Sequence, residues 1–176
     1  MVMKSSLSFI LFLLLTFTGC NKTNNPRLSG TDTIDNLLYG EGPYYAIGFS
    51  FSTAEKVSTL KDPGPDITLE NDGTLINLIL QTDVGLNGFY LAGEYADASA
   101  AQQAFDNITS PNVTDWADWA FSIKPNQVWI YRSGTEHYAK FRIISTISET
   151  RNSWDYAECT FEWVYQPDGT LTFPGK

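Results

Sequence analysis

The chain has 176 residues, and its 20 acidic and 11 basic side chains give it a formal net charge of −9. Such an acidic surface repels nucleic acids and anionic lipid headgroups, so we expect neither as a partner. Cysteine occurs only at Cys20 and Cys159, and aromatic residues make up 14% of the chain. Most of the aromatics fall in alternating patterns, which favours strands over helices.

The first twenty residues resemble the leader of a bacterial lipoprotein. Lys4 supplies a positive charge, residues 7–17 are almost wholly apolar, and small residues precede Cys20. The apolar run is shorter than the roughly 20 residues that a membrane-spanning helix needs. In bacterial lipoproteins the cysteine at this place is acylated and the leader is removed, and two or three acyl chains anchor the protein stably. The alternatives are an ordinary signal peptide or a buried first helix.

This resemblance divides the chain into three parts and implies a location. We expect a signal peptide at residues 1–19, a lipidated Cys20 with a polar tether through residue 40, and a single β-rich domain over residues 41–176. Loss of the signal peptide removes one charged residue, Lys4, so the net charge changes from −9 to −10. The implied location is the bacterial cell envelope, with a lipid anchor in the outer membrane. The domain would then lie on either the periplasmic or the external side of that membrane.

Alternating patterns predict strands in the first half of the domain. The clearest pattern alternates large apolar with small side chains, which is typical of a half-buried strand. The pair Asp72-Gly73 lies between two such stretches and predicts a two-residue type I′ hairpin. Strands are expected at residues 45–51, 66–71, 74–82 and 88–95.

One helix is predicted, over residues 98–107. This stretch is rich in Ala and Gln, and Asp97 or Ser99 can cap its amino end. Trp116 and Trp119 follow at a spacing of three residues, so they share a face if this segment is helical. The two tryptophans are therefore candidates for a platform that stacks on a planar ligand or on a sugar ring. The alternative is a packing cluster between helix and sheet.

The carboxy-terminal third is predicted to be an antiparallel meander, because every link is too short for a parallel crossover. Its strands are expected at residues 128–132, 137–148 and 154–166. The last strand should bury one parity, comprising Cys159, Phe161, Trp163 and Tyr165. Glu162, on the opposite parity, should be solvated. The predicted fold is thus mainly β, an antiparallel meander or sandwich with one or two short helices.

The closing strands resemble those of the HmuY family of Bacteroidetes haem-binding lipoproteins. Residues 128–143 combine an apolar strand that ends in Arg132, a glycine-containing turn, and Ala-Lys before a second apolar strand. Residues 160–169 are similar to the closing strand of that family, and residues 45–51 to its opening strand. The resemblance implies a sandwich-like β fold, haem or a related porphyrin as ligand, and an outer-membrane transporter as partner.

The sequence departs from this family at the haem ligands. Family members hold the iron with two axial side chains, usually His or Met, upstream of the closing hairpin. Residues 66–71, where one of these would lie, contain neither. Both methionines of the chain fall within the leader, and His137 is the only histidine. The usual pair of axial ligands is therefore not matched.

The remaining haem-binding candidates lie around the closing hairpin. His137 is the candidate axial ligand, and tyrosinate from Tyr131 or Tyr138 is the next donor. We expect both tyrosines to have the parity opposite to His137, so that a single strand cannot present both donor types to one iron without a bulge. Arg132 and Lys140 are candidates for contacts with the propionates. These residues predict weak, five-coordinate haem binding.

A second hypothesis is a glycan-binding or protein-interaction lipoprotein that binds no haem. Exposed aromatic side chains would then stack on sugar rings or contact a partner. The sequence holds no nucleophile elbow, phosphate loop, HExxH or CxxC motif, so we expect a binding protein and not an enzyme. One histidine and one free cysteine are also too few strong ligands for zinc.

Overall fold

The chain folds into two antiparallel sheets and one short helix, which confirms the mainly β prediction. The computed structural model describes residues 27–73, 75–80 and 88–175. No helix within these ranges is long and apolar enough to cross a membrane. The first sheet has the strand order β1 (Ser29–Asp35), β11 (Trp154–Gln166), β10 (Tyr138–Arg151), β9 (Gln127–Arg132) and β7 (Gly88–Glu94).

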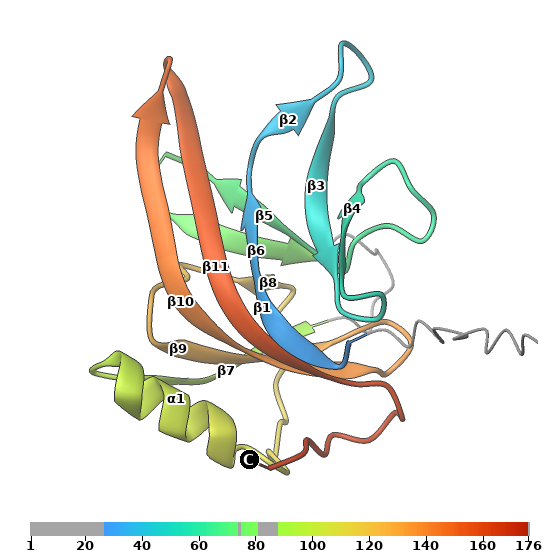
Figure 1. Ribbon diagram of the computed structural model, residues 1–176, viewed down its shortest axis with the longest axis vertical. Coiled ribbons are helices and arrows are strands. Elements are labelled where there is room, and N and C mark those ends of the chain that lie inside the picture. Colours follow the sequence, from blue (N-terminus) through green and yellow to red (C-terminus); the bar gives the residue numbers. More distant parts are fainter. Residues whose placement is uncertain (1–26, 74, 81–87, 176) are drawn as a thin grey trace, which may run out of the picture.

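The second sheet lies against the first and is made of shorter strands (Figure 1). Its order is β2 (Leu38–Tyr39), β3 (Tyr45–Ser50), β5 (Ile67–Asn71), β6 (Ile76–Leu80) and β8 (Trp119–Ala120), and β4 (Glu55–Ser58) pairs with β3. All strand pairs in both sheets are antiparallel, as the short links require.

The core between the sheets is built largely from aromatic rings. The Phe49 ring of β3 lies 5.4 Å from that of Phe161 and 5.3 Å from that of Trp163, both on β11. Phe161 and Trp163 are fully buried, and Tyr165 is 6% exposed, which confirms the inward parity predicted for β11. Cys159 is buried on the same face. Period-two alternation therefore correctly assigned the buried face of this strand.

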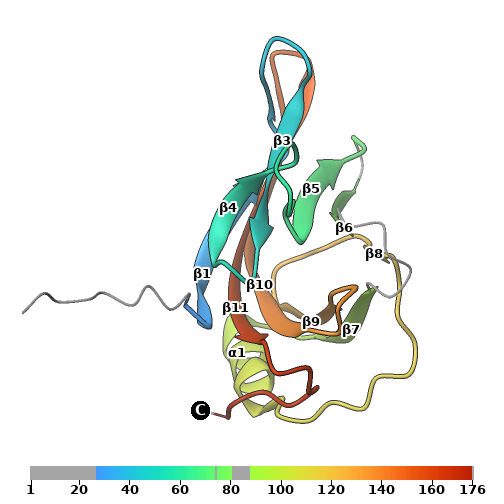
Figure 2. The ribbon, with the colours of Figure 1, turned by 90° about the vertical axis from the view of Figure 1, so that its right-hand side faces the viewer.

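The single helix of the described residues, α1 (Ala98–Asn107), covers the other face of the first sheet (Figure 2). The Asp97 carboxylate accepts a hydrogen bond from the Ala100 N–H at 2.9 Å, so the predicted amino-terminal cap is present. At the opposite end, Lys140 Nζ donates to the carbonyl oxygens of Phe105 and Ile108 at 2.7 and 2.8 Å. A second apolar cluster, including Phe105, fills the space beneath α1.

The prediction of a tether through residue 40 is wrong over its second half. Residues 29–35 form β1, which pairs with β11 from Ser29↔Val164 to Asp35↔Glu158, and Ile34 is 1% exposed. This strand is mostly polar, so hydrophobic alternation does not reveal it. Its place depends on backbone pairing with the edge of β11. The folded domain thus begins before residue 41.

The hairpin at Asp72-Gly73 is present, but its turn is longer than predicted. Asn71 pairs with Ile76, so the paired residues are separated by more than the two residues of a type I′ turn. Gly73 has a φ of +86°, a backbone conformation that favours glycine. The Asp72 side chain accepts from the Leu75 N–H at 2.8 Å, so the aspartate closes the loop through its carboxylate.

Candidate functional site

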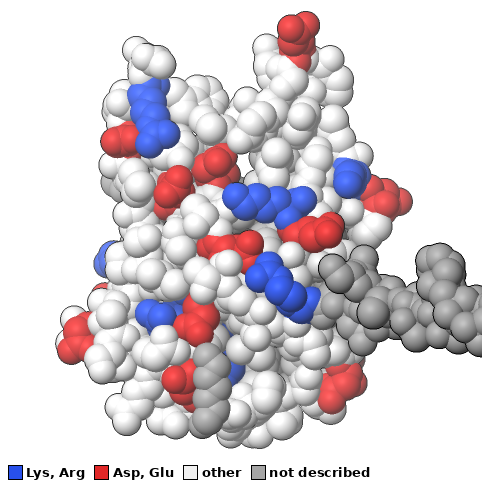
Figure 3. Space-filling view, viewed as in Figure 1, with Lys and Arg blue, Asp and Glu red and all other residues white. Residues whose placement is uncertain are grey.

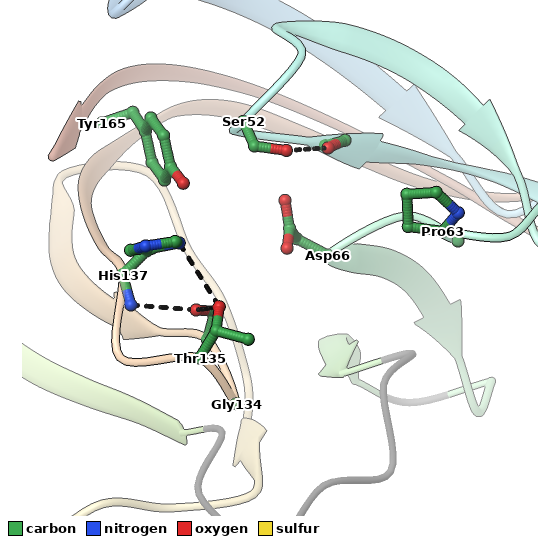
Figure 4. A pocket seen from close by; sticks show the side chains of 10 residues that line it. Ser52, Pro63, Asp66, Gly134, Thr135, His137 and Tyr165 are labelled. Carbon is green, nitrogen blue, oxygen red and sulfur yellow. Dashed lines mark hydrogen bonds between the residues drawn. The ribbon is translucent and has the colours of Figure 1, made fainter. Parts of the chain in front are cut away.

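A pocket of about 250 Å³ opens at one end of the sandwich (Figure 4). Three parts of the chain form it: the end of β3 with the residues just after it, the segment before β5, and the β9–β10 turn with the end of β11. The lining residues are Ser50, Ser52, Pro63, Gly64, Asp66, Ser133, Gly134, Thr135, His137 and Tyr165. Most of these side chains carry a hydroxyl, imidazole or carboxylate group, so the pocket is suited to hydrogen bonding.

Asp66 lies at the centre of this pocket in Figure 4. Its backbone N–H donates to the Phe49 carbonyl at 2.9 Å, which fixes the residue just ahead of β5. One carboxylate oxygen accepts from the Tyr131 hydroxyl at 3.0 Å, and the other accepts from the Phe51 N–H at 2.7 Å. Burial raises the pKa of Asp66 above its ordinary value, although the hydrogen bonds from Phe51 and Tyr131 oppose that shift.

Tyr131 lies behind Asp66 in the core and is fully buried. Burial, together with the Asp66 charge and hydrogen bond, raises the pKa of this phenol well above its ordinary value. Tyr131 is therefore a neutral donor and a poor source of tyrosinate. The expected parity was also wrong for this residue: Tyr131 pairs with Ala139 across the β9–β10 ladder. Since paired residues share a face, Tyr131 lies on the same face as His137.

His137 is held at the pocket mouth by the β9–β10 turn. Its backbone N–H donates to Ser133 Oγ at 3.0 Å, and its Nδ1 lies 3.3 Å from Thr135 Oγ1. The Tyr165 ring meets the imidazole edge-on at a centroid distance of 6.3 Å. Burial, with a smaller contribution from Asp66, raises the pKa of Tyr165 to about 12. Tyr165 therefore contributes a protonated hydroxyl to the pocket at neutral pH.

The Asp66 carboxylate, the Tyr165 hydroxyl and the His137 ring face one shared space in Figure 4. Ser50 and Ser52 border the same space, with their hydroxyl oxygens 3.1 Å apart. This arrangement can hold a small polar molecule by several directed hydrogen bonds. No group of three or more His, Cys, Asp or Glu side chains in the described part of the chain is placed to hold a metal ion.

The other predicted haem-contacting residues do not reach this pocket. Lys140 lies on the opposite face of the sheet, buried beneath α1. Arg132 lies over the ring of Trp116, with its guanidinium carbon 4.5 Å from the ring centroid, and Tyr138 packs against the same ring at 6.3 Å. Alternation along β10 explains why Lys140 lies on the opposite face, since Lys140 has the parity opposite to His137. Of the predicted set, only His137 lines the pocket, and only Tyr131 lies directly behind it.

The predicted tryptophan platform does not form. The segment that carries Trp116 and Trp119 is not helical: Ala117 bridges to Phe89, and Trp119 belongs to β8. Trp119 stacks on Phe121 at 5.4 Å with nearly parallel rings, while Trp116 packs against Tyr138. A spacing of three residues brings side chains together only on a helix, so the two tryptophans have different partners in this extended segment.

A second hollow, of about 380 Å³, lies between the tips of two hairpins. The β2–β3 and β10–β11 hairpins project from the same end of the molecule, with a notch between their tips (Figure 3). The lining side chains are Leu37, Leu38, Tyr44 and Trp154, all partly exposed. This hollow is apolar, whereas the first pocket combines a carboxylate with hydroxyls and an imidazole.

Sequence reasoning missed Asp66 and Tyr165 as site residues. Tyr165 was correctly predicted to face inward, and Asp66 begins a predicted strand just after a Pro-Gly-Pro segment. A carboxylate at the buried end of an apolar strand is a signal that could have been noticed. Cys20, the predicted lipidation site, lies outside the described residues. Comparison with known proteins finds no matching family model and no matching curated protein.

Proposed function

We propose that this protein is a lipid-anchored binding protein of the bacterial cell envelope that holds a small polar ligand. The observation that carries the proposal is the convergence of Asp66, His137 and Tyr165 on one pocket. These residues come from distant parts of the chain, and hydrogen bonds and ring contacts hold each of them in place. Such preorganised polar groups reduce the cost of ordering a site when a ligand binds.

The pocket volume supports a small ligand. Pockets for drug-sized molecules measure about 300–1,000 Å³, and this one holds about 250 Å³. A single sugar ring or a molecule the size of an amino acid matches this space and its hydroxyl-rich lining. The proposal thus takes up the glycan-binding alternative, but it places the sugar in this pocket and not on a tryptophan platform.

Haem, the ligand implied by the HmuY resemblance, does not match the pocket. The haem macrocycle is larger than most drug-sized ligands, whereas the pocket holds only about 250 Å³. His137 is the only predicted iron ligand that lines it, because Tyr131 is held by Asp66 and Tyr138 packs against Trp116. We therefore propose no iron ligation in this pocket.

The pocket lies near the point where the chain enters the domain. Arg27 donates to the Ala54 carbonyl at 3.5 Å, and Ala54 is two residues from Ser52 in the pocket wall. Seven residues from Cys20 to Arg27 extend at most about 25 Å. A lipid on Cys20 would therefore keep this end of the domain close to the membrane.

The anchor is tested by replacing Cys20 with serine. The variant should lose labelling by a palmitate analogue and leave the membrane fraction, whereas a Cys159→Ser control should keep both properties because Cys159 is buried in the core. Membrane association that survives Cys20→Ser contradicts the anchor. This experiment is independent of what the pocket binds.

The pocket is tested by ligand-dependent thermal stability. Monosaccharides, amino acids and small amines are screened at millimolar concentration, with haem as a separate arm read by its Soret band. A ligand at 100 times its Kd stabilises the fold by about 2.7 kcal/mol, which raises the Tm of a domain of this size by roughly 5–10 °C. Tyr165→Phe should reduce the shift. The proposal fails if no small molecule stabilises the protein, or if haem alone does.

A further inference from the structure

The Asp66 carboxylate forms no ion pair with a basic side chain among the described residues. The ion pairs that join Arg27 to Asp32, Arg142 to Glu162 and Arg151 to Glu149 do not involve Asp66. Partly buried carboxylates are usually paired with a cation, because removal of their hydration is costly. The missing countercharge at Asp66 is therefore a feature to be explained.

The hydrogen bonds at Asp66 identify the carboxylate as an acceptor. The Phe51 N–H can only donate, and it contacts one carboxylate oxygen at 2.7 Å. The Tyr131 hydroxyl lies 3.0 Å from the other oxygen. Donors on both oxygens favour the ionised form against the burial that raises the pKa of Asp66, but neither donor supplies a positive charge. The carboxylate faces the space shared with Tyr165 and His137 in Figure 4.

The described residues of the pocket wall also include no lysine or arginine. His137 is the only lining side chain that can become positive. The remaining polar groups are hydroxyls, which accept hydrogen bonds as readily as they donate them. The pocket thus has one carboxylate, several hydroxyl acceptors, and the Tyr165 ring along one side.

We propose that the ligand of this pocket carries a protonated amino group that forms an ion pair with Asp66. This inference rests on the proposed function and specifies the chemical class of the ligand. The hydroxyls of Ser50 and Ser52 lie beside Asp66 and can accept the remaining ammonium protons. The polar body of the ligand then lies against Tyr165 and His137.

Two sources can supply this chemistry. One is a soluble amine such as an amino sugar, and the other is the ethanolamine headgroup of a lipid. The contact of Arg27 with Ala54 places the pocket end of the domain near the chain entrance, within reach of a membrane if Cys20 is lipidated. The shared feature is the primary ammonium group, and the experiment separates the two sources.

The test compares matched ligands by calorimetry on the full-length protein. Glucosamine is compared with glucose and N-acetylglucosamine, which lack the positive charge. Free ethanolamine is compared with vesicles that present ethanolamine or choline headgroups. We expect an amine to bind at least ten-fold more tightly than its uncharged analogue. If only the ethanolamine vesicles bind, the source is a lipid, and if free amines bind, the source is soluble.

Two variants locate the effect. Asp66→Asn should weaken amine binding at least ten-fold, whereas Asp62→Asn, an exposed carboxylate in the same segment, should leave it unchanged. If Asp66→Asn does not fold, the comparison of amine with uncharged ligand on the unaltered protein still decides the question. Uncharged ligands that bind as tightly as amines overturn this inference and leave the proposed function standing. If no compound in the wider screen binds, both fail.

Discussion

Replacing Phe161 with alanine should remove a large part of the stability of the fold. The Phe161 ring is fully buried and lies edge-on to Phe49 at 5.4 Å and to Phe141 at 6.2 Å. Truncation of a buried phenylalanine costs about 3–5 kcal/mol through lost burial and the cavity that remains. The lost edge-to-face contacts place this site near the upper end, at about 4–5 kcal/mol.

The free energy of unfolding is measured by urea denaturation with tryptophan fluorescence. The matched control is Phe121→Ala, because Phe121 is 58% exposed and has one stacked partner, Trp119. That change should cost about 1 kcal/mol. Small domains have only about 5–15 kcal/mol of stability, so Phe161→Leu provides an intermediate step if the alanine variant unfolds. Equal losses at positions 161 and 121 would refute the packing described for this core.

Three further predictions concern charged and titratable side chains. Glu162→Ala should lower the free energy of unfolding, measured by urea denaturation, by about 1–2 kcal/mol, because Glu162 pairs with Arg142 at 3.1 Å in a partly buried site. An ordinary surface change costs about 0.5 kcal/mol or less, so a loss below about 0.5 kcal/mol contradicts the pairing. Lys140→Met should cost about 2–4 kcal/mol and reduce the helical circular dichroism signal, because two carbonyls at the end of α1 lose their donor; an unchanged helix would show that Lys140 does not hold α1. The pKa of Tyr165 is about 12 in the folded chain against an ordinary 10. The protonated phenol therefore contributes to the stability of the fold, and this contribution is complete below pH 10 and is lost as the pH rises from 10 to 12. The urea midpoint should fall over that window, and the part of the fall due to Tyr165 should disappear in Tyr165→Phe.

Local patterns predicted the helix, and they also predicted the strands that bury one face. Alternation along residues 154–166 correctly placed Phe161 and Trp163 inward, and Asp97 was correctly named as a cap for α1. The strand at residues 29–35 was missed, since a mostly polar strand at a sheet edge has no hydrophobic signature. The solvated position expected for Glu162 was also wrong, because α1 and Arg142 cover that face of the sheet.

The sequence by itself determined which strand faces are apolar, where the helix starts, and the acidic charge of the chain, because these properties depend on neighbouring residues and composition. Only the tertiary structure decided what each face meets. It placed Lys140 beneath α1 and brought Asp66 and Tyr165, 99 positions apart in the sequence, to one pocket. The register of backbone hydrogen bonds between strands that are distant in sequence determines which side chains come together. No local periodicity encodes that register.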